Sequence, residues 1–256
     1  MIDPRAVVSP QAELAPDVSV GPFSVIGPQV HIGPRTVVGP HAVVNGQTTI
    51  GTDNRIFQFA SLGDAPQDKK YRGEPTVLAI GDRNVFRESC TMNRGTAHDK
   101  GATCIGNDNL FMAYSHVAHD CVIGSNTVFA NSVALGGHVE VGDWAILGGL
   151  TAVHQFTKIG AHAFLGGGSI LSRDVPPYVM VAGNPAVPHG VNAEGLKRRG
   201  FSEEQIRNVR EAYRLLYRSQ LKLAEAIERL APLAAEHAEI RAFVDFINAS
   251  TRSLVR

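Results

Sequence analysis

Residues 105–134 read IGNDNL FMAYSH VAHDCV IGSNTV FANSVA, and every block of six begins with an aliphatic residue or phenylalanine. The same rhythm continues without a miss to Leu171, and an earlier run of it extends from Ile2 to Leu62. A period of six fits neither the 3.6-residue turn of a helix nor the two-residue alternation of a plain strand. It does fit a short strand followed by a corner, so that three such blocks form one triangular coil.

Stacked coils of this kind would place each apolar residue above its equivalent in the next coil, at about the 4.8 Å spacing between strands. The sequence therefore predicts a mainly β fold, a parallel β-helix over residues 1–185. The rhythm stops near residues 64–79 and 93–104. We expect each interruption to be a loop pushed outward from the coils, where binding residues are commonly found.

A helical pattern replaces the six-residue rhythm toward the C-terminus. Ser202–Gln205 forms a capping box, and apolar residues then recur at helical spacing. We therefore expect residues 190–256 to form a small all-α domain. The arginines spaced to share one helix face are Arg207, Arg210, Arg214 and Arg218. Such a face is either an ordinary solvated surface or a dock for an acidic protein.

The composition excludes several classes of protein. Lys and Arg total 24, as do Asp and Glu, so no net charge draws the chain to nucleic acid or to an anionic membrane. Three cysteines without CxxC spacing disfavour a disulfide framework and favour a reducing compartment. The N-terminus lacks the layout of a signal peptide, and no apolar run approaches the roughly 20 residues of a membrane span. We expect a cytoplasmic protein with no stable membrane insertion.

The clearest candidates for chemistry are histidines that fall between the apolar positions and should point outward or lie at corners. They are His116, His119, His138, His154 and His162. Because three blocks make one coil, Asp120 and His138 occupy equivalent places in adjacent coils, and His119 faces Gly137 one coil further on. A histidine base beside a carboxylate and a glycine N–H suits acyl transfer. Clustered histidines also bind zinc, and the residues alone leave open both interpretations as well as that of plain surface histidines.

Several motifs resemble the UDP-N-acetylglucosamine O-acyltransferase family. They are Ala118–Cys121, Gly137–Val139, Thr151–Phe156, Asp174–Tyr178 and Gly190–Phe201. The resemblance covers essentially the whole chain and implies a left-handed β-helix that forms a homotrimer, with active sites between neighbouring chains. It implies transfer of an (R)-3-hydroxyacyl group from acyl carrier protein to the 3-hydroxyl of UDP-N-acetylglucosamine, the first step of lipid A synthesis. It implies neither a cofactor nor a metal.

The resemblance also implies roles for single residues. His119 would be the general base, Asp120 its partner, and the Gly137 N–H the donor to the oxyanion. The implied substrate contacts are Gln67, Asp68, Lys70, His116, His138, His154, Gln155, Asn192, Glu194 and Arg198. Gly167 matches the position that limits acyl length, and its lack of a side chain implies a long acyl chain, on the order of twelve to fourteen carbons. Asn93 stands where the family usually has histidine, which leaves open an acceptor with a 3-amino group.

Three competing interpretations make different predictions. The N-acyltransferase of the same pathway carries an extra N-terminal domain, whereas the six-residue rhythm here begins at Ile2. A γ-carbonic-anhydrase-like trimer would hold zinc through its histidines, but that type lacks the motif at residues 192–199 and the long helical tail. A non-catalytic scaffold predicts that His119→Ala changes nothing.

Overall fold

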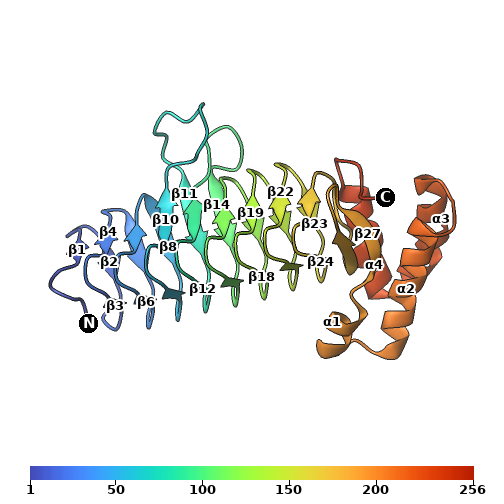
Figure 1. The fold of residues 1–256 in the computed structure, drawn as a ribbon, viewed down its shortest axis with the longest axis horizontal. Coiled ribbons are helices and arrows are strands. Elements are labelled where there is room, and N and C mark those ends of the chain that lie inside the picture. Colours follow the sequence, from blue (N-terminus) through green and yellow to red (C-terminus); the bar gives the residue numbers. More distant parts are fainter.

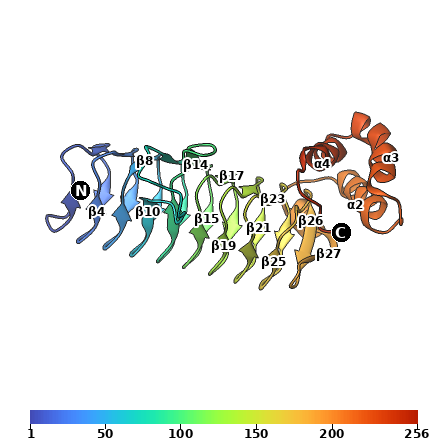
Figure 2. The same ribbon diagram turned by 90° about the horizontal axis from the view of Figure 1, so that it is seen from above.

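A long three-sided column followed by a bundle of helices makes up the chain in the computed structural model, which describes residues 1–256 (Figure 1). Each coil of the column contributes one short strand to each of three sheets, and the coils follow one another along the column in chain order (Figure 2). This is the left-handed parallel β-helix that the sequence and its resemblance predicted.

The three sheets have nine, eight and ten strands. The first sheet contains β1 (Val7–Val8), β4 (Val25–Ile26), β7 (Val43–Val44), β10 (Ser61–Asp64), β13 (Thr91–Asn93), β16 (His116–Val117), β19 (Ala134–Leu135), β22 (Ala152–Val153) and β25 (Ile170–Leu171). The second contains β2 (Glu13–Leu14), β5 (Val30–Ile32), β8 (Gln47–Ile50), β11 (Val77–Ile80), β14 (Ala102–Ile105), β17 (Val122–Ile123), β20 (Glu140–Val141) and β23 (Lys158–Ile159). The third contains β3 (Ser19–Val20), β6 (Val37–Val38), β9 (Arg55–Ile56), β12 (Val85–Phe86), β15 (Leu110–Phe111), β18 (Val128–Phe129), β21 (Ile146–Leu147), β24 (Phe164–Leu165), β26 (Val179–Ala182) and β27 (Val187–Val191).

The residues on the six-residue rhythm form the core of the column. Phe86, Phe111 and Phe129 are fully buried, and their rings lie in successive coils with centroids 5.0 and 4.8 Å apart. Such ring contacts add to the free energy gained from burying the apolar surface. Because equivalent side chains contact one another from coil to coil, the core is continuous along the column and holds each corner at a fixed height.

The two interruptions of the rhythm are outward loops on one side of the column (Figure 1). Along the first sheet Ser61 pairs with Thr91, and Thr91 pairs with His116. Both steps are longer in sequence than the regular step from His116 to its partner Ala134, so each of these coils contains extra residues. The loops run over residues 65–76 and 94–101 and are shorter than the rhythm predicted, because β11 and β14 already begin at Val77 and Ala102.

Four helices follow the column: α1 (Ala193–Arg198), α2 (Glu203–Tyr217), α3 (Leu223–Glu236) and α4 (Ala238–Ala249). The predicted capping box is present, since Ser202 accepts from the Gln205 backbone and the Gln205 side chain accepts from the Ser202 N–H. After α4 the chain returns to the column, where the buried Asp174 carboxylate accepts a hydrogen bond from Ser250 and Leu254 bridges to the Asp174 backbone. None of the helices is long and apolar enough to cross a membrane.

Candidate active site

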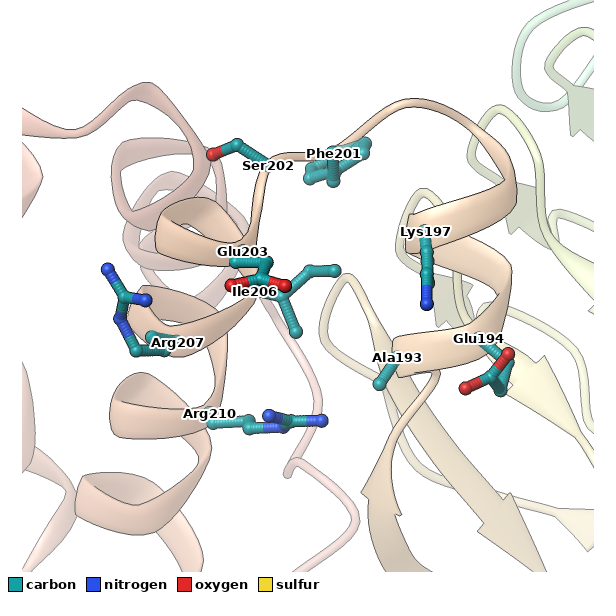
Figure 3. A pocket seen from close by; sticks show the side chains of 9 residues that line it. All are labelled: Ala193, Glu194, Lys197, Phe201, Ser202, Glu203, Ile206, Arg207 and Arg210. Atoms are coloured by element: carbon teal, nitrogen blue, oxygen red, sulfur yellow. The ribbon is translucent and has the colours of Figure 1, made fainter.

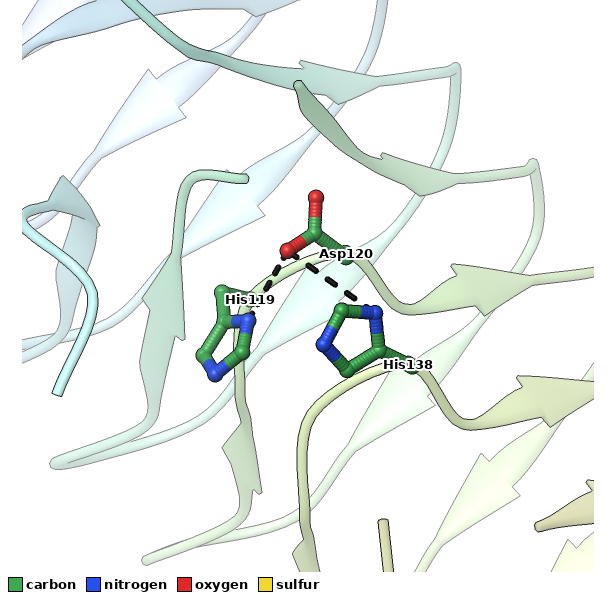
Figure 4. Close-up of side chains that lie close together, drawn as sticks. All are labelled: His119, Asp120 and His138. Carbon is green, nitrogen blue, oxygen red and sulfur yellow. Dashed lines mark hydrogen bonds and ion pairs between the residues drawn. The ribbon is translucent and has the colours of Figure 1, made fainter. Parts of the chain in front are cut away.

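His119 and Asp120 lie at a corner between the first and second sheets, just after β16 (Figure 4). The His119 Nδ1 lies 2.9 Å from the Asp120 Oδ2. Because a carboxylate only accepts hydrogen bonds, this contact places the proton of a neutral imidazole on Nδ1 and leaves Nε2 as an acceptor. The pair thus has the protonation pattern that a general base requires.

Asp120 is fully buried and is held by the second outward loop. Its oxygens accept hydrogen bonds from the Thr96 N–H at 3.0 and 3.1 Å and from the Thr96 hydroxyl at 2.7 Å. Burial alone would raise the pKa of Asp120, but the hydrogen bonds from Thr96 and His119 outweigh it and hold the pKa below its usual value. Asp120 is therefore a stable anion beside the imidazole.

Gly137 lies against the His119 ring, as the spacing of one coil predicted. A Cβ built on Gly137 would come within 2.5 Å of His119 Cε1 and 2.7 Å of Nε2. The Gly137 N–H has no acceptor within the chain. A backbone donor next to the base is what stabilisation of an oxyanion requires.

His138 occupies the corner position one coil beyond Asp120, and both residues have positive φ, 64° and 59°. Its ring stacks on Phe156 with the centroids 4.2 Å apart and meets His119 edge-on at 5.0 Å. Its Nδ1 is 2.6 Å from an oxygen of Asp99, in the second outward loop. The coil spacing thus brings His119, Asp120 and His138 together, as predicted (Figure 4).

His116 points outward from the first sheet beside this corner. The Thr91 hydroxyl, in the preceding coil, lies 2.7 Å from its Nδ1. Burial, followed by the nearby His119, lowers the pKa of His116. His116 is therefore a largely neutral hydrogen-bonding group at neutral pH.

The two outward loops enclose a cavity of about 280 Å³ over this corner. Its lining residues are Asp68, Lys70, Thr96, His98, Asp99, His138 and Phe156. Two of the three candidates in the first loop thus lie at the site, whereas Gln67 is exposed and does not line the cavity. Asn93 does not line it either, because its side chain is buried and donates to the Ala65 carbonyl at the base of the first loop.

His154 and Gln155 lie further along the same edge. Gln155 occupies the position one coil after Gly137, and both His154 and Gln155 are exposed. The chain segment after α4 reaches them, since Arg252 lies 3.2 Å from the His154 Nδ1 and donates to the Gln155 carbonyl. Gly167 lies on another edge of the column, at the corner between β24 and β25 that joins the third and first sheets. It is exposed, and a Cβ built on it would come within 3.3 Å of the Gly149 carbonyl oxygen.

Metal binding at this corner was the alternative to base catalysis. His119, Asp120 and His138 offer ligand atoms within 4.8 Å of one another. However, Asp120 already accepts hydrogen bonds from Thr96 and His119 and is closed to solvent. A cation would have to displace these bonds, so the donor set fits a hydrogen-bonded base better than a zinc site.

The predicted nucleotide contacts lie on a different edge of the column. Asn192 caps α1, accepting from the Gly195 N–H, and donates to the carbonyl of His162, at a corner between the second and third sheets. Glu194 and Arg198 are exposed on α1. Within one chain, these residues are not brought together with His119.

Aromatic rings surround His162 at that second edge. Trp144 and Tyr178 stack on it, Phe201 meets it edge-on, and the Arg199 guanidinium lies 3.2 Å from its Nδ1. Burial, followed by Arg199, lowers the pKa of His162 to about 4. Arg199 also lies over the Trp144 ring at 5.2 Å, so a cation and an aromatic surface are presented together.

Several partners of the site residues were not predicted from the sequence. Phe156 could have been found, because it lies one coil after His138. Thr96 and Asp99 could not, since an outward loop has no period that places its side chains. Arg252 could not either, because its position depends on the return of the chain after α4.

Comparison with known proteins identifies the family. A family model described as UDP-N-acetylglucosamine O-acyltransferase, domain 2, matches residues 174–255, and the bacterial transferase hexapeptide model matches residues 12–46 and 105–137. Acyl-(acyl-carrier-protein)–UDP-N-acetylglucosamine O-acyltransferase from Thiobacillus denitrificans is 58% identical over 203 residues, 79% of either chain. The enzyme of the same name from Stutzerimonas stutzeri is 52% identical over 256 residues, 100% of this chain and 99% of its own.

Solved structures agree over the whole chain. UDP-N-acetylglucosamine O-acyltransferase from Moraxella catarrhalis matches with a TM-score of 0.98 at 45% identity, covering 100% of this chain and 99% of its own. UDP-N-acetylglucosamine acyltransferase from Francisella novicida matches with a TM-score of 0.98 at 43% identity, covering 100% of this chain and 94% of its own. With identities this high over the column, the loops and the helices alike, the chain belongs to the UDP-N-acetylglucosamine O-acyltransferase family.

Proposed function

We propose that the protein transfers an (R)-3-hydroxyacyl group from acyl carrier protein to the 3-hydroxyl of UDP-N-acetylglucosamine, the first step of lipid A synthesis. The observation that carries the proposal is the contact between the His119 Nδ1 and the buried Asp120, which leaves Nε2 free to accept a proton. The names of the relatives give an acylated carrier protein and UDP-N-acetylglucosamine, which supports the donor and the acceptor of this proposal.

In the proposed reaction, the His119 Nε2 removes the proton of the sugar 3-hydroxyl as its oxygen attacks the thioester carbon. The Gly137 N–H donates to the oxyanion that forms on the carbonyl oxygen. When the C–S bond breaks, the thiolate of the carrier's prosthetic group takes the proton from the His119 imidazolium. No covalent acyl-enzyme is formed, and Asp120 stabilises the imidazolium throughout.

The cavity between the loops supports a role for Asp68, Lys70 and His138 in holding the reacting groups. Lys70 supplies a cation and Asp68 an acceptor at the cavity that His138 also lines. On the edge that joins the third and first sheets, the exposed Gly167 carries no side chain that would stop a long acyl chain. His154 and Gln155, one coil further along the edge of His119 and Gly137, would contact the donor or the sugar.

We also propose that the protein acts as a homotrimer in the cytoplasm. The edge that joins the third and first sheets carries apolar side chains with 60–70% of their surface exposed, namely Phe59, Tyr114 and Leu150. Exposed apolar surface of this extent is typical of protein contacts. A neighbouring chain on this surface could bring its Asn192, Glu194 and Arg198 to the His119 corner, which one chain alone does not do. Free cysteines, two of them buried, fit a reducing compartment.

Basic residues of the helical domain support the proposal that it docks the acidic carrier protein. Lys197 on α1 and Arg207 and Arg210 on α2 line a cavity of about 640 Å³ between the two helices (Figure 3). Arg214, on the same helix, is instead paired with Glu211 at 2.6 Å. The basic face predicted on α2 is thus partly neutralised, and we place the dock at its N-terminal half.

An acyl-transfer assay with purified protein, UDP-N-acetylglucosamine and a series of 3-hydroxyacyl carrier proteins tests the reaction. We expect product from the wild type and a loss of about 10²- to 10⁴-fold in kcat for His119→Ala, the usual contribution of a general base. Product from the 3-amino sugar nucleotide alone would show that this compound, and not UDP-N-acetylglucosamine, is the acceptor. An unchanged rate for His119→Ala would refute the mechanism, and activity lost on chelation would favour the metal interpretation.

A complementation experiment tests the shared site. His119→Ala and Arg198→Ala chains would each be assayed alone and then after co-expression. If each site is built from two chains, some interfaces of the mixture would combine an intact His119 from one chain with an intact Arg198 from the other. The activity of the mixture should then exceed that of either variant alone. A mixture no more active than its components would place the whole site within one chain, and a monomeric mass in light scattering would exclude the trimer.

A further inference from the structure

The second outward loop contributes a carboxylate to the catalytic corner that the hexapeptide repeats do not supply. The Asp99 Oδ2 lies 2.6 Å from the His138 Nδ1, whereas the nearest Asp120 oxygen is 4.0 Å from the same nitrogen. Asp120 is already engaged by Thr96 and His119. Asp99 is therefore the hydrogen-bond partner of His138, and each imidazole of the corner has its own carboxylate.

This contact determines which nitrogen of His138 faces the site. A carboxylate accepts, so the Nδ1 of His138 carries a hydrogen in both the neutral and the protonated ring. The Nε2 atom is then an acceptor in the neutral ring and a donor in the imidazolium. In Figure 4 this second nitrogen is on the side of the ring toward His119.

The surroundings of His138 fix the plane of its ring but do not select its tautomer. Phe156 is parallel to it within 7°, and His119 is perpendicular to it at 90°. A ring held between these neighbours could still exchange its proton between the two nitrogens. Asp99 is the one acidic group within hydrogen-bond distance of either nitrogen, so it supplies the missing constraint.

The loop holds Asp99 from both sides. Thr96, three residues earlier, donates to Asp120 through its N–H and its hydroxyl, and Lys100, the next residue, forms an ion pair with Glu140 at 3.1 Å. The Asp99 side chain is itself 41% exposed. An ion pair this exposed to solvent contributes little to the stability of the fold. We therefore expect the contact of Asp99 to act on the orientation of the His138 ring.

We propose that Asp99 is a positioning residue that holds the Nδ1–H of His138 and so presents Nε2 to the substrates in the loop cavity. Its effect on turnover rests on the proposed acyl transfer, whereas its effect on the His138 tautomer does not. The substrate group that meets Nε2 is a hydroxyl, amide or thioester carbonyl of the sugar or the acyl donor.

Two variants and one control test the proposal. Asp99→Ala removes the acceptor, and Asp99→Asn keeps an oxygen that can accept while removing the charge. Lys100→Ala is the matched control, because it breaks the adjacent ion pair of the same loop and leaves Asp99 in place. The full-length protein, labelled with ¹⁵N-histidine, reports the tautomer of the neutral ring, with the His138 signals assigned by their absence in His138→Gln.

We expect the Nδ1–H form of His138 in the wild type, in Asp99→Asn and in Lys100→Ala, and a shift toward the Nε2–H form in Asp99→Ala. In the transfer assay, kcat/KM should fall about tenfold or more in Asp99→Ala, since misplaced groups at a reacting centre cost rate, and stay near the wild-type value in Lys100→Ala. An unchanged tautomer in Asp99→Ala, or an active enzyme with an unchanged kcat/KM, would overturn the proposal. A tautomer shift in a protein without transferase activity would support the positioning role and refute the proposed reaction.

Discussion

The His119 ring lies against the backbone of Gly137, so close that a Cβ on Gly137 would come within 2.5 Å of the ring. We therefore expect Gly137→Ala to displace the imidazole and to lower kcat by about a hundredfold, the order of loss that follows a misplacement of about 1 Å. The φ of Gly137 is not positive, so alanine brings no backbone strain of that kind. Steady-state kinetics and a thermal melt measure the two effects separately.

Gly167→Ala is the control for this substitution, because its added methyl would meet only the Gly149 backbone, at 3.3 Å or more. It should keep kcat with donors of medium length. Equal losses of kcat in both variants would argue against a specific contact between Gly137 and His119.

The hydroxyl of Thr96 stabilises the Asp120 anion, so Thr96→Val should reduce stability in a pH-dependent way. The lost hydrogen bond to a charged, buried carboxylate should cost about 1–3 kcal/mol at neutral pH. The pKa of Asp120 is lowered in the folded protein, so its stabilisation is present above the ordinary value of 3.8 and is lost as the pH falls through the folded value. The free energies of unfolding of variant and wild type should therefore converge in acid.

Thr103→Val is the matched control, because the Thr103 hydroxyl accepts from the Asp120 N–H rather than from its carboxyl. Its destabilisation should not depend on the protonation of Asp120. Urea denaturation of the three proteins between pH 7 and pH 3 makes the comparison. A Thr96→Val cost that is constant over this range would show that Thr96 does not stabilise the anion.

His162 should make the protein less stable as the solution becomes acidic. Its pKa is lowered from 6.5 to about 4 in the folded state, so between these values the unfolded chain binds a proton that the folded chain excludes. Stability from this residue is thus present above pH 6.5 and is lost as the pH falls toward about 4. His162→Phe, which keeps a ring between Trp144 and Tyr178, should flatten the dependence of the unfolding free energy on pH.

Trp144→Phe changes the same aromatic cluster without removing a titratable group. It should shift the stability curve as a whole and keep the acid slope. If His162→Phe and the wild type lose stability in parallel between pH 6.5 and pH 4, the slope arises from other groups.

The periodicity accounts for what could be predicted of this site from the sequence. Val117 and Ile123 on the rhythm place His119 and Asp120 at a corner, and the spacing of one coil then sets Gly137 and His138 beside them. The periodicity does not predict the positions of Thr96, Asp99 or Arg252, because these depend on loop paths and on the packing of α4. The contact of Asn192 with His162 could not be predicted either, because the sequence of a helix cap does not show which corner of the column the cap contacts.

The space that we propose for the acyl chain at Gly167 should shorten when a side chain is added there. We expect Gly167→Met to shift the preferred donor to a shorter acyl chain, because the new side chain would extend from an exposed position that has no side chain in the wild type. Each methylene contributes about 1–3 kcal/mol to discrimination in an apolar pocket. Competition between carrier proteins with acyl chains of different length measures the ratio of kcat/KM. An unchanged preference would place the end of the groove elsewhere.

Binding at the dock that we propose for the carrier protein should depend on charge at Arg210. Arg210 lies with Lys197 and Arg207 at the cavity between α1 and α2, and Arg214 is already paired with Glu211. Arg210→Glu should therefore raise the KM for the acyl carrier protein several-fold, while Arg214→Glu, the matched control, should have the smaller effect. Because attraction of this kind is screened by salt, the difference between Arg210→Glu and wild type should shrink as the ionic strength rises. The KM for the sugar nucleotide should stay unchanged in both variants, and an equal rise for both substrates would indicate that Arg210 contributes to the nucleotide site instead.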